Sequence, residues 1–504
     1  MSSPQDITGD GQHFFEARRK VFPKAVDGPF RRLKWAIMVV TLAIYYVTPW
    51  LRWNRGPWAP DQAVLVDLAH RRFYMFAIEI WPHEFYYVAG LLIMAGIGLF
   101  LVTSAVGRAW CGYACPQTVW TDLFVHVERA IDGDRNAQIK LQRAPWGQTK
   151  ILRRVAKHAI WLIIGALTGG AWIFYFADAP TLGHAFVHGT APFIAYATVG
   201  VLTATTYIFG GLMREQVCIY MCPWPRIQSA MLDEKSLTVT YKAWRGEPRT
   251  HGLKRDATGP DSDAMPSLVA LAERPELAER IGDCIDCNAC IAVCPTGIDI
   301  REGPQIGCIT CGLCIDACDG IMAKVGRPSR LIGYTTDLDA RLATKGEQPV
   351  PALKRLFRPR TLVYFGAWAA IGLVMLFALG NRTRIDISVL QTRNPQWVRL
   401  SDGSTRNAYT VNIRNMEGRP RSVEVTIDGV PGGVLWTEAS GRAQAARSLK
   451  LNVAPDQVAQ AQLFVAAPGQ GPERTDLTFT VRALDAEGGT AQDKSFFERP
   501  EQPE

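Results

Sequence analysis

Two cysteine-rich stretches set the organisation of this chain: CIDCNACIAVC at residues 284–294 and CITCGLCIDAC at residues 308–318. Both space their cysteines as C-x2-C-x2-C-x3-C. Three thiolates on a tight loop take three corners of an iron–sulfur cube, and the fourth, one helical turn on, reaches the other cube. The spacing therefore predicts two 4Fe–4S clusters with exchanged ligands. The ligand sets are Cys284, Cys287, Cys290 and Cys318, and Cys308, Cys311, Cys314 and Cys294.

The alternative for these eight cysteines is a pair of zinc sites or a set of reactive thiols. Zinc sites usually take their four ligands as two separated pairs, which two repeated four-cysteine runs do not match. One feature departs from the first run: Cys318 is followed by Asp319, whereas Cys294 is followed by Pro295. We expect this change to loosen one cluster edge without removing a ligand.

The composition indicates a multidomain membrane protein. The chain has 504 residues, of which 48% are apolar and 20% charged, and its net charge is +8. This balance excludes a disordered or fibrous protein. All 12 cysteines lie in three short neighbourhoods, and none follows Cys318. That distribution favours metal ligation in a reducing compartment over a secreted disulfide framework.

Five blocks without Asp, Glu, Lys or Arg are apolar enough to cross a membrane, since a spanning helix needs about 17–25 such residues. Basic residues gather before the first block, between the second and third, and before the fifth. This bias predicts a cytoplasmic N-terminus and an outer C-terminus, and it explains the positive charge without nucleic-acid binding. The blocks are Trp35–Leu51, Phe85–Gly107, Ala159–Ala177, Gly189–Met213 and Thr361–Asn381.

The pattern C-x-Y-x-C-P occurs twice, with Cys111 and Cys115 after the second block and Cys218 and Cys222 after the fourth. In a continuing helix, residues i and i+4 share a face, so the two thiols of a pair would point the same way. The following proline would then end or kink the helix. Two such pairs brought together would offer four sulfurs.

Three roles remain open for these four cysteines. Soft thiolates favour Cu(I), each pair can also cycle between dithiol and disulfide, and buried cysteines can simply pack as small hydrophobes. A repeated six-residue pattern favours a redox or metal role. Met221 and His126 are weaker candidates for additional ligands, and packing is the simpler interpretation of both.

The segments predicted to lie outside the membrane have a different pattern of apolar and polar residues. Phe73–Trp81 is apolar but short, and we expect it to lie in the interface or to re-enter the membrane. Glu79, His83 and Glu84 then lie at the mouth of the second span, where a solvated rim is the simpler interpretation. After residue 381, apolar residues alternate with polar ones between Gly- and Pro-rich turns, which predicts an antiparallel β-sandwich. These alternating residues include Tyr409, Val411, Ile413, Leu477, Phe479 and Val481.

The chain resembles the FixG/RdxA/CcoG polyferredoxin family, the cytochrome c oxidase accessory proteins. The resemblance rests on CGYACPQTVWTDLF, EQVCIYMCPWPRIQSAMLDEKSLTVTY, GDCIDCNACIAVCPTGIDIR and CITCGLCIDACD. It covers nearly the whole chain and implies a bacterial inner-membrane protein that helps to assemble a cbb(3)-type oxidase. The implied role is reduction of Cu(II) to Cu(I). The family's cluster and membrane cysteines all have counterparts here.

The predicted fold is therefore a multidomain membrane protein with a five-span α-helical bundle. An α+β domain like a bacterial two-cluster ferredoxin is inserted in it, and an all-β immunoglobulin-like sandwich follows it. The expected parts are a cytoplasmic segment (1–34), four spans with both cysteine pairs (35–213), a cytoplasmic region (214–360) with the ferredoxin-like domain at about 275–325, a fifth span (361–381) and a periplasmic domain (382–504).

The hypothesis for function is the transfer of single electrons. An unidentified cytoplasmic donor reduces two 4Fe–4S clusters, and the clusters pass electrons to a copper site at the four membrane cysteines. Expected partners are copper ions, copper-export or copper-chaperone proteins, oxidase assembly factors and membrane lipid, and a homodimer is a further candidate assembly. One alternative is quinol-linked electron transfer to another redox enzyme, although polar groups for a quinone are sparse within the spans. Another is a non-enzymatic copper-binding scaffold.

Overall fold

The computed structural model describes residues 20–57, 59–249, 282–348, 357–455, 457–485 and 488–500. Most of the expected N-terminal segment and the first residues of the expected ferredoxin-like range lie outside these residues, as does the side chain of His83. The chain divides into two compact units. One comprises Met1–Pro49 with Val88–Ile371, and the other comprises Trp50–Tyr87 with Gly372–Glu504.

Five helices of the described residues are long and apolar enough to cross a membrane, as predicted. The third begins at Gln148 rather than Ala159, because its first turns are helical although they carry Lys150, Arg153 and Lys157. The fourth ends in a π-helical turn. The helices are α1 (Pro29–Val47), α2 (Tyr86–Val106), α6 (Gln148–Ile173), α8 (Phe193–Thr206) with η3 (Tyr207–Met213), and α17 (Pro359–Gly380).

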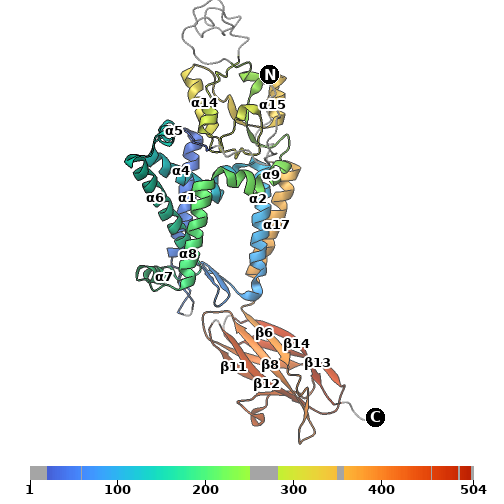
Figure 1. Cartoon of the computed structure of the whole chain (residues 1–504). Helices are drawn as coiled ribbons and strands as arrows, with labels where there is room; N and C mark the ends of the chain where they lie inside the picture. Colours follow the sequence, from blue (N-terminus) through green and yellow to red (C-terminus); the bar gives the residue numbers. More distant parts are fainter. Residues whose placement is uncertain are drawn as a thin grey trace, which may run out of the picture. The chain divides into compact units, whose positions relative to one another are not determined.

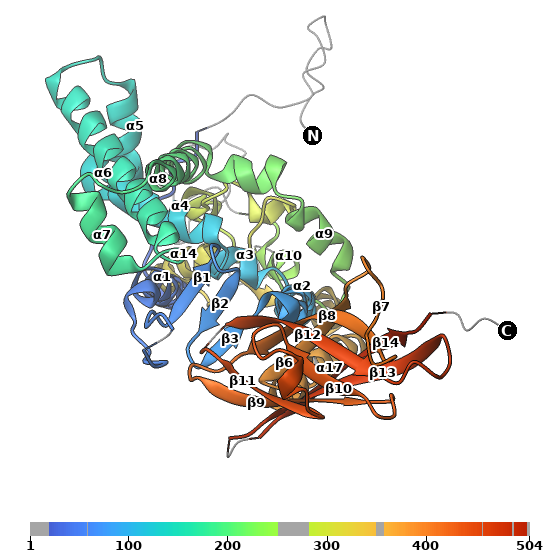
Figure 2. The same ribbon diagram turned by 90° about the horizontal axis from the view of Figure 1, so that it is seen from below.

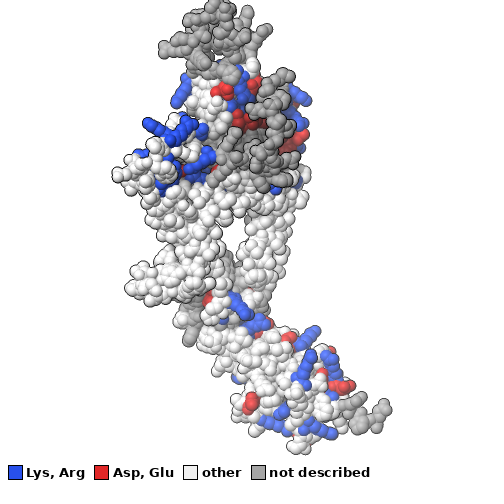
Figure 3. Space-filling view, in the orientation of Figure 1, with Lys and Arg blue, Asp and Glu red and all other residues white. Residues whose placement is uncertain are grey.

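These helices form two groups in the first unit, as Figures 1 and 2 show: α1, α6 and α8 lie together, and α2 lies beside α17. Ser104 on α2 hydrogen-bonds Thr361 on α17 at 2.9 Å. Lys and Arg gather at the end of the first group where α4 and α5 lie (Figure 3). The additional helices are α3 (Ala109–Tyr113), α4 (Pro116–Asp132), α5 (Arg135–Arg143), α7 (Ala179–Val187) and α9 (Trp224–Met231).

Two glycines bring α6 and α8 into close contact. A Cβ on Gly165 would lie 3.0 Å from the carbonyl oxygen of Thr203, and a Cβ on Gly169 would lie 2.9 Å from that of Val199. Small residues four apart allow this approach between membrane helices, where close packing replaces the hydrophobic effect as the main attraction. The packing fixes the base from which η3 and the second cysteine pair extend.

The cluster-binding region is an α+β unit within the same compact unit. Strand β4 (Thr238–Tyr241) pairs antiparallel with β5 (Ile332–Thr335), although their sequences flank the two cysteine runs on opposite sides. The core between the strands and helices contains Val239, Ile315 and Met322. Further elements are α10 (Ala243–Gly246), α13 (Ala289–Val293), η5 (Ile300–Glu302), α14 (Leu313–Lys324) and α15 (Asp337–Thr344).

The second unit contains the predicted sandwich, whose two sheets share one core. One sheet has the order β10-β12-β8-β6 with β7 paired to β8, and the other has the order β11-β9-β13-β14. Tyr409 and Phe479 come from different sheets, and their rings meet edge to face at 5.0 Å. The strands are β6 (Ile385–Gln391), β7 (Val398–Arg399), β8 (Thr405–Asn415), β9 (Arg421–Asp428), β10 (Val434–Thr437), β11 (Ser448–Val453), β12 (Val458–Ala467), β13 (Arg474–Ala483) and β14 (Thr490–Glu498).

The segment Phe73–Trp81 is not one re-entrant stretch. It belongs to a small antiparallel sheet of β1 (Val64–Asp67), β2 (Arg72–Met75) and β3 (Ile78–Ile80). The two carboxylates expected at this mouth are paired. Glu79 lies 3.0 Å from Arg72, and Glu84 accepts a hydrogen bond from the Trp81 amide. This differs from the expected solvated rim, because Glu84 is buried and the Glu79 side chain is only 15% exposed.

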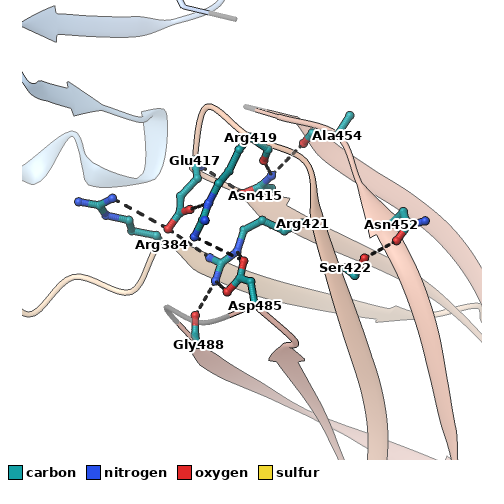
Figure 4. Close-up of polar contacts among 10 residues, drawn as sticks. All are labelled: Arg384, Asn415, Glu417, Arg419, Arg421, Ser422, Asn452, Ala454, Asp485 and Gly488. Carbon is teal, nitrogen blue, oxygen red and sulfur yellow. Dashed lines mark hydrogen bonds and ion pairs between the residues drawn. The ribbon is translucent and has the colours of Figure 1, made fainter. Parts of the chain in front are cut away.

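A network of ions closes one end of the sandwich (Figure 4). Arg421, whose side chain is buried, donates to both oxygens of Asp485 at 2.6 and 2.7 Å. Arg419 lies 2.7 Å from Glu417, which also faces Arg421 and Arg384 at longer distances. These contacts join the start of β9 to the turn after β13.

Candidate iron–sulfur centre and cysteine pairs

The two predicted cluster loops have the same backbone conformation. In each, the residue before the central cysteine and the residue after it have positive φ: 51° and 57° at Asp286 and Asn288, and 50° and 74° at Thr310 and Gly312. Few residues other than glycine adopt this region readily. The repeated geometry curls each loop around its central cysteine, so the two runs are alike in structure as well as in spacing.

Each loop leads directly into a helix that carries the fourth cysteine away from the first three. Asn288 precedes α13, and Cys294 ends it. Gly312 precedes α14, within which Cys318 is buried. The fourth cysteine of each run therefore lies where it can reach the other loop.

Two cavities lie at these loops, and their linings follow the predicted exchange of ligands. Cys284, Cys287, Cys290 and Cys318 line a cavity of about 340 Å³, together with Tyr241 and Arg301 among others. Cys308, Cys311, Cys314 and Cys294 line a second cavity of about 370 Å³, which Cys290 also borders.

The donor sets fit 4Fe–4S clusters better than zinc. Each set takes three cysteines from one tight loop and the fourth from the helix that follows the other loop, whereas a structural zinc site usually takes its four ligands as two separated pairs. Burial raises the pKa of the Cys290 and Cys308 thiols to about 11 and that of Cys318 to about 12. These thiols are therefore protonated until they bind iron, and cluster assembly must release their protons.

The membrane cysteines do not lie on continuing helices as expected. Cys111 is in the short helix α3, and Cys115 caps the N-terminus of α4, whose first residue is Pro116. Proline is favoured at a first helical position because its missing N–H would have no partner there. The proline thus begins a helix instead of ending one, and the chain turns between the two thiols.

The second pair lies in irregular backbone. Cys218 is in the π-helical turn η4 (Val217–Met221), and Cys222 follows it in an extended conformation. Just before this turn, Arg214 has φ 42° and ψ −106°, which is unfavourable for a residue with a side chain. Such strain and π-helical turns occur disproportionately at functional sites.

The two pairs nevertheless lie together. Cys111, Cys115 and Cys222 are all close enough to Cys218 for their charges to raise its pKa, to about 12 with burial as the main cause. Of the weaker candidate ligands, the His126 ring packs on Trp35 at 4.8 Å, and the Met221 side chain, next to Cys222 in the chain, is 53% exposed. The four thiols thus share one neighbourhood, and no three of them surround a single ion position.

Helix α3 packs directly on the loop of the second cluster set. A Cβ on Gly112 would lie 2.6 Å from the Ile309 carbonyl oxygen, so only glycine fits here. The Tyr113 hydroxyl donates to the Cys311 carbonyl at 3.0 Å, and the Tyr334 hydroxyl donates to that of Thr310. Cys111 therefore belongs to one apolar cluster with Ile309 and Cys311.

Arg108 lies at the same junction. Its side chain donates to the Ile306 carbonyl at 2.8 Å and to Gln228 Oε1 at 3.4 Å, and the Cys111 thiol also donates to Gln228, at 3.1 Å. Arg108 is 3% exposed, and its Nη2 has no hydrogen-bond partner. Arg108, Tyr113 and Gln228 were not predicted. The sequence held one signal for Arg108: a basic residue, Arg108 or Arg214, stands three or four positions before the first cysteine of each pair.

The N-terminal segment ties the cluster region to the first span. Asp316, between two cluster cysteines on α14, accepts hydrogen bonds from the amides of Phe30 and Arg31 at 3.3 and 2.8 Å. These amides belong to the first turn of α1, where a helix has unpaired donors. A carboxylate on one helix thus caps the start of another.

A polar cavity of about 510 Å³ lies beside the second pair. It is bordered by Cys218, by the cluster-loop residues Ile309 and Leu313, and by polar side chains at the start of α1 and on α4. Polar groups were expected to be sparse within the spans. Many of the polar side chains that border this cavity are on α4, which is not a span, and two are at the start of α1. They include Arg31, Lys34, Gln117, Thr121 and Asp122.

Known proteins resemble this chain over most of its length. Residues 213–337 match a family described as a 4Fe–4S dicluster domain, residues 88–132 a 4Fe–4S binding domain, and residues 375–500 the Ig-like fold at the C-terminus of FixG. Nitrogen fixation protein FixG of Rhizobium meliloti is 56% identical over 90% of this chain and 87% of its own. Proteins RdxA and RdxB of Cereibacter sphaeroides are 52% and 51% identical over at least 94% of both chains.

These matches agree with the cysteine loops, the apolar helices and the sandwich. The protein is a membrane-associated iron–sulfur protein of electron transfer, and it belongs to the FixG/RdxA family.

Proposed function

We propose that this protein reduces Cu(II) to Cu(I) at Cys111, Cys115, Cys218 and Cys222, for assembly of the copper centre of a cbb(3)-type cytochrome c oxidase. The observation that carries the proposal is the packing of α3, which holds Cys111, on the Cys308–Cys314 loop. Two 4Fe–4S clusters, when bound, supply single electrons. Each Cu(II) accepts one, and an unidentified cytoplasmic reductant replaces it.

The residues around the thiols suit this role. Cu(I) prefers soft sulfur ligands, so a thiol site stabilises the product relative to Cu(II). Tyr113 and Gly112 hold the first pair within contact of the Cys311 loop, which shortens the path between the two. The buried charge of Arg108 lies near Cys111, Cys218 and Cys222 and favours electron density on that side.

The proposed arrangement in the cell follows from the basic residues at the helix ends. The N-terminus and the cluster region lie in the cytoplasm, and the sandwich lies in the periplasm of a bacterial inner membrane. Cu(I) would pass from the thiols to copper-export or copper-chaperone proteins. All four thiols lie on the cluster side, so the copper reduced is cytoplasmic or in transit.

The test is a Cys115→Ser/Cys222→Ser variant, with Met221→Ala as the control because Met221 is exposed beside Cys222. Iron content and the EPR signal of the reduced clusters should be unchanged in both variants. Cu(II) reduction should be lost only in the double variant. Unchanged reduction would contradict the proposal, and copper bound stoichiometrically without turnover by the parent chain would indicate a scaffold instead.

The 510 Å³ cavity supports a second candidate, oxidation of a quinol. Four cations and two carboxylates surround it beside Cys218 and Ile309, and this excess of positive charge suits an organic donor better than a free Cu(II) ion. A membrane quinol would then be the electron donor to the clusters. This candidate predicts that a soluble quinol analogue reduces the clusters of the parent chain. The Gln117→Leu variant should lose this reaction but should still reduce Cu(II) after its clusters have been reduced with dithionite. If the quinol analogue does not reduce the clusters of the parent chain, the candidate is excluded.

A further inference from the structure

A further cavity, of about 700 Å³, lies at the basic end of α6, and none of its described lining residues is a cysteine. Its walls come from the first turns of α6, from the end of η3 and from the segment before α1. Most of its polar lining is cationic, and Glu215 is the one carboxylate among the described residues that border it. The lining residues are Lys20, Val21, Arg154, Lys157, His158, Trp161, Gly211, Leu212, Arg214 and Glu215.

The cations in this cavity are of two kinds. Lys157 is 1% exposed and lies 3.0 Å from Glu128 and 2.7 Å from Asp132, so its charge is neutralised within the protein. Arg214 is paired with Glu128 in the same way, at 2.5 Å. Arg154, by contrast, lies 4.0 Å from Asp132. Lys20, at the edge of the cavity, is exposed.

The protein surface next to the cavity is apolar. Leu152 and Val155 on the same turns of α6 are 70% and 59% exposed, and Leu212 at the end of η3 is 39% exposed. Below these turns, α6 and α8 continue as membrane spans. Figure 3 shows basic side chains gathered in this region, next to the uncharged sides of the helices. The cavity therefore lies between a basic end of the helices and an exposed apolar surface.

We infer that this cavity binds a phosphate group, and that the phosphate is the head group of an anionic phospholipid. Lys20 and Arg154 would bind the phosphate oxygens, and the acyl chains would lie on the exposed apolar faces of α6 and η3. Basic pockets between membrane helices suit such head groups because they combine charge with access from the bilayer.

The test measures lipid retention by the full-length protein, using native mass spectrometry with added dioleoylphosphatidylglycerol or dioleoylphosphatidylcholine. Lys20→Gln/Arg154→Gln removes the two cavity charges. Arg143→Gln/Arg153→Gln removes two exposed charges outside the cavity and is the matched control. Two charges near a membrane surface correspond to a change of about 30-fold in affinity. Lys20→Arg/Arg154→Lys keeps both charges and should retain the lipid.

The expected result is preferential retention of phosphatidylglycerol, lost about 30-fold in the cavity variant and nearly unchanged in the control. Equal retention of both lipids, or equal losses in the two glutamine variants, would overturn the inference. Inorganic phosphate at millimolar concentration could displace the lipid and bind equally well when phosphatidylcholine is the only lipid present. That result would support a phosphate site but overturn its assignment to a lipid head group. Cu(II) reduction is not a readout here, so the outcome is independent of the proposed function.

Discussion

Arg108 joins the membrane thiols to the second cluster loop through two side-chain contacts, one to Ile306 and one to Gln228. The Cys111 thiol shares Gln228 Oε1 with it. A buried guanidinium with one unpartnered nitrogen is costly to retain. Its position suggests that it holds the junction in register and favours electrons there.

Replacing Arg108 should separate these two effects. Arg108→Gln removes the charge, so we expect a lower reduction potential for the cluster held by Cys308, Cys311 and Cys314, and slower Cu(II) reduction. Losing a hydrogen bond from a charged donor should also lower the free energy of unfolding by about 1.5–3 kcal/mol. An EPR-monitored redox titration gives the potential.

Arg108→Lys is the control, because it keeps the charge but loses the planar fork. Its potential should stay near that of the parent chain even where its stability falls. Equal potentials in the Gln and Lys variants would mean that Arg108 has only a structural role.

The ion network of the sandwich predicts a dependence on pH. The Arg421 guanidinium holds the pKa of Asp485 below its usual value of 3.8. A carboxyl with a lowered pKa stabilises the fold above its unfolded pKa, and this contribution is lost as pH falls through the folded value. Asp485→Asn should therefore destabilise the sandwich at pH 7, and its difference from the parent chain should shrink as the pH falls below 3.8.

Hydrogen exchange of β9 and β13 in the full chain, followed by mass spectrometry at pH 7 and after equilibration at pH 3, measures this difference. A variant that lost as much protection at pH 3 as at pH 7 would show that the ion pair is not the cause.

Single residues also show where sequence reasoning reaches its limit. The eight cluster cysteines could be assigned to sets because ligand spacing is fixed by the geometry of the cluster itself. Tyr113, Gln228 and Asp316 could not, since they act through partners more than 100 residues away in the chain. No local pattern records such a contact.

At the scale of elements, the short helix α3 is the piece that couples the spans to the cluster region. Its contact with the Ile309–Cys311 backbone depends on the missing side chain of Gly112. Gly112→Ala should force the two apart and cost about 1–3 kcal/mol of unfolding free energy, as overpacking usually does. Cu(II) reduction should slow while the iron content is kept.

Gly170→Ala is the matched control, because a Cβ at Gly170 on α6 meets nothing within 4 Å. Both rates are measured by trapping Cu(I) with a colorimetric chelator. A Gly112→Ala variant as fast as the Gly170→Ala control would show that the contact does not carry the coupling.

The elements themselves were predicted with unequal success. The apolar blocks gave all five candidate spans, and the alternating residues gave the sandwich core, because burial leaves a direct pattern in each. The break at each cysteine pair was missed. A helix continuing through Cys111 and Cys115 satisfied the spacing, but Pro116 is also a favoured first residue, and tertiary contacts decided between these options.

At the scale of the molecule, the first compact unit joins spans and cluster loops rather than keeping them as separate domains. The strands β4 and β5 enclose the cysteine runs, and Asp316 caps the first span. Assembly of the clusters should thus stabilise the bundle as well as the loops, since a group that binds only the folded state adds its binding energy to stability.

The most direct test mixes anaerobically purified, dithionite-reduced and desalted protein with Cu(II) and follows the EPR signal of the reduced clusters. The protein should carry about eight iron and eight sulfide ions, the content of two 4Fe–4S clusters. We expect the cluster signal to disappear as Cu(I) forms, with one Cu(I) for each electron lost. A signal that persists in the presence of Cu(II), or protein that contains neither iron nor sulfide, would contradict the proposed path of electrons to copper.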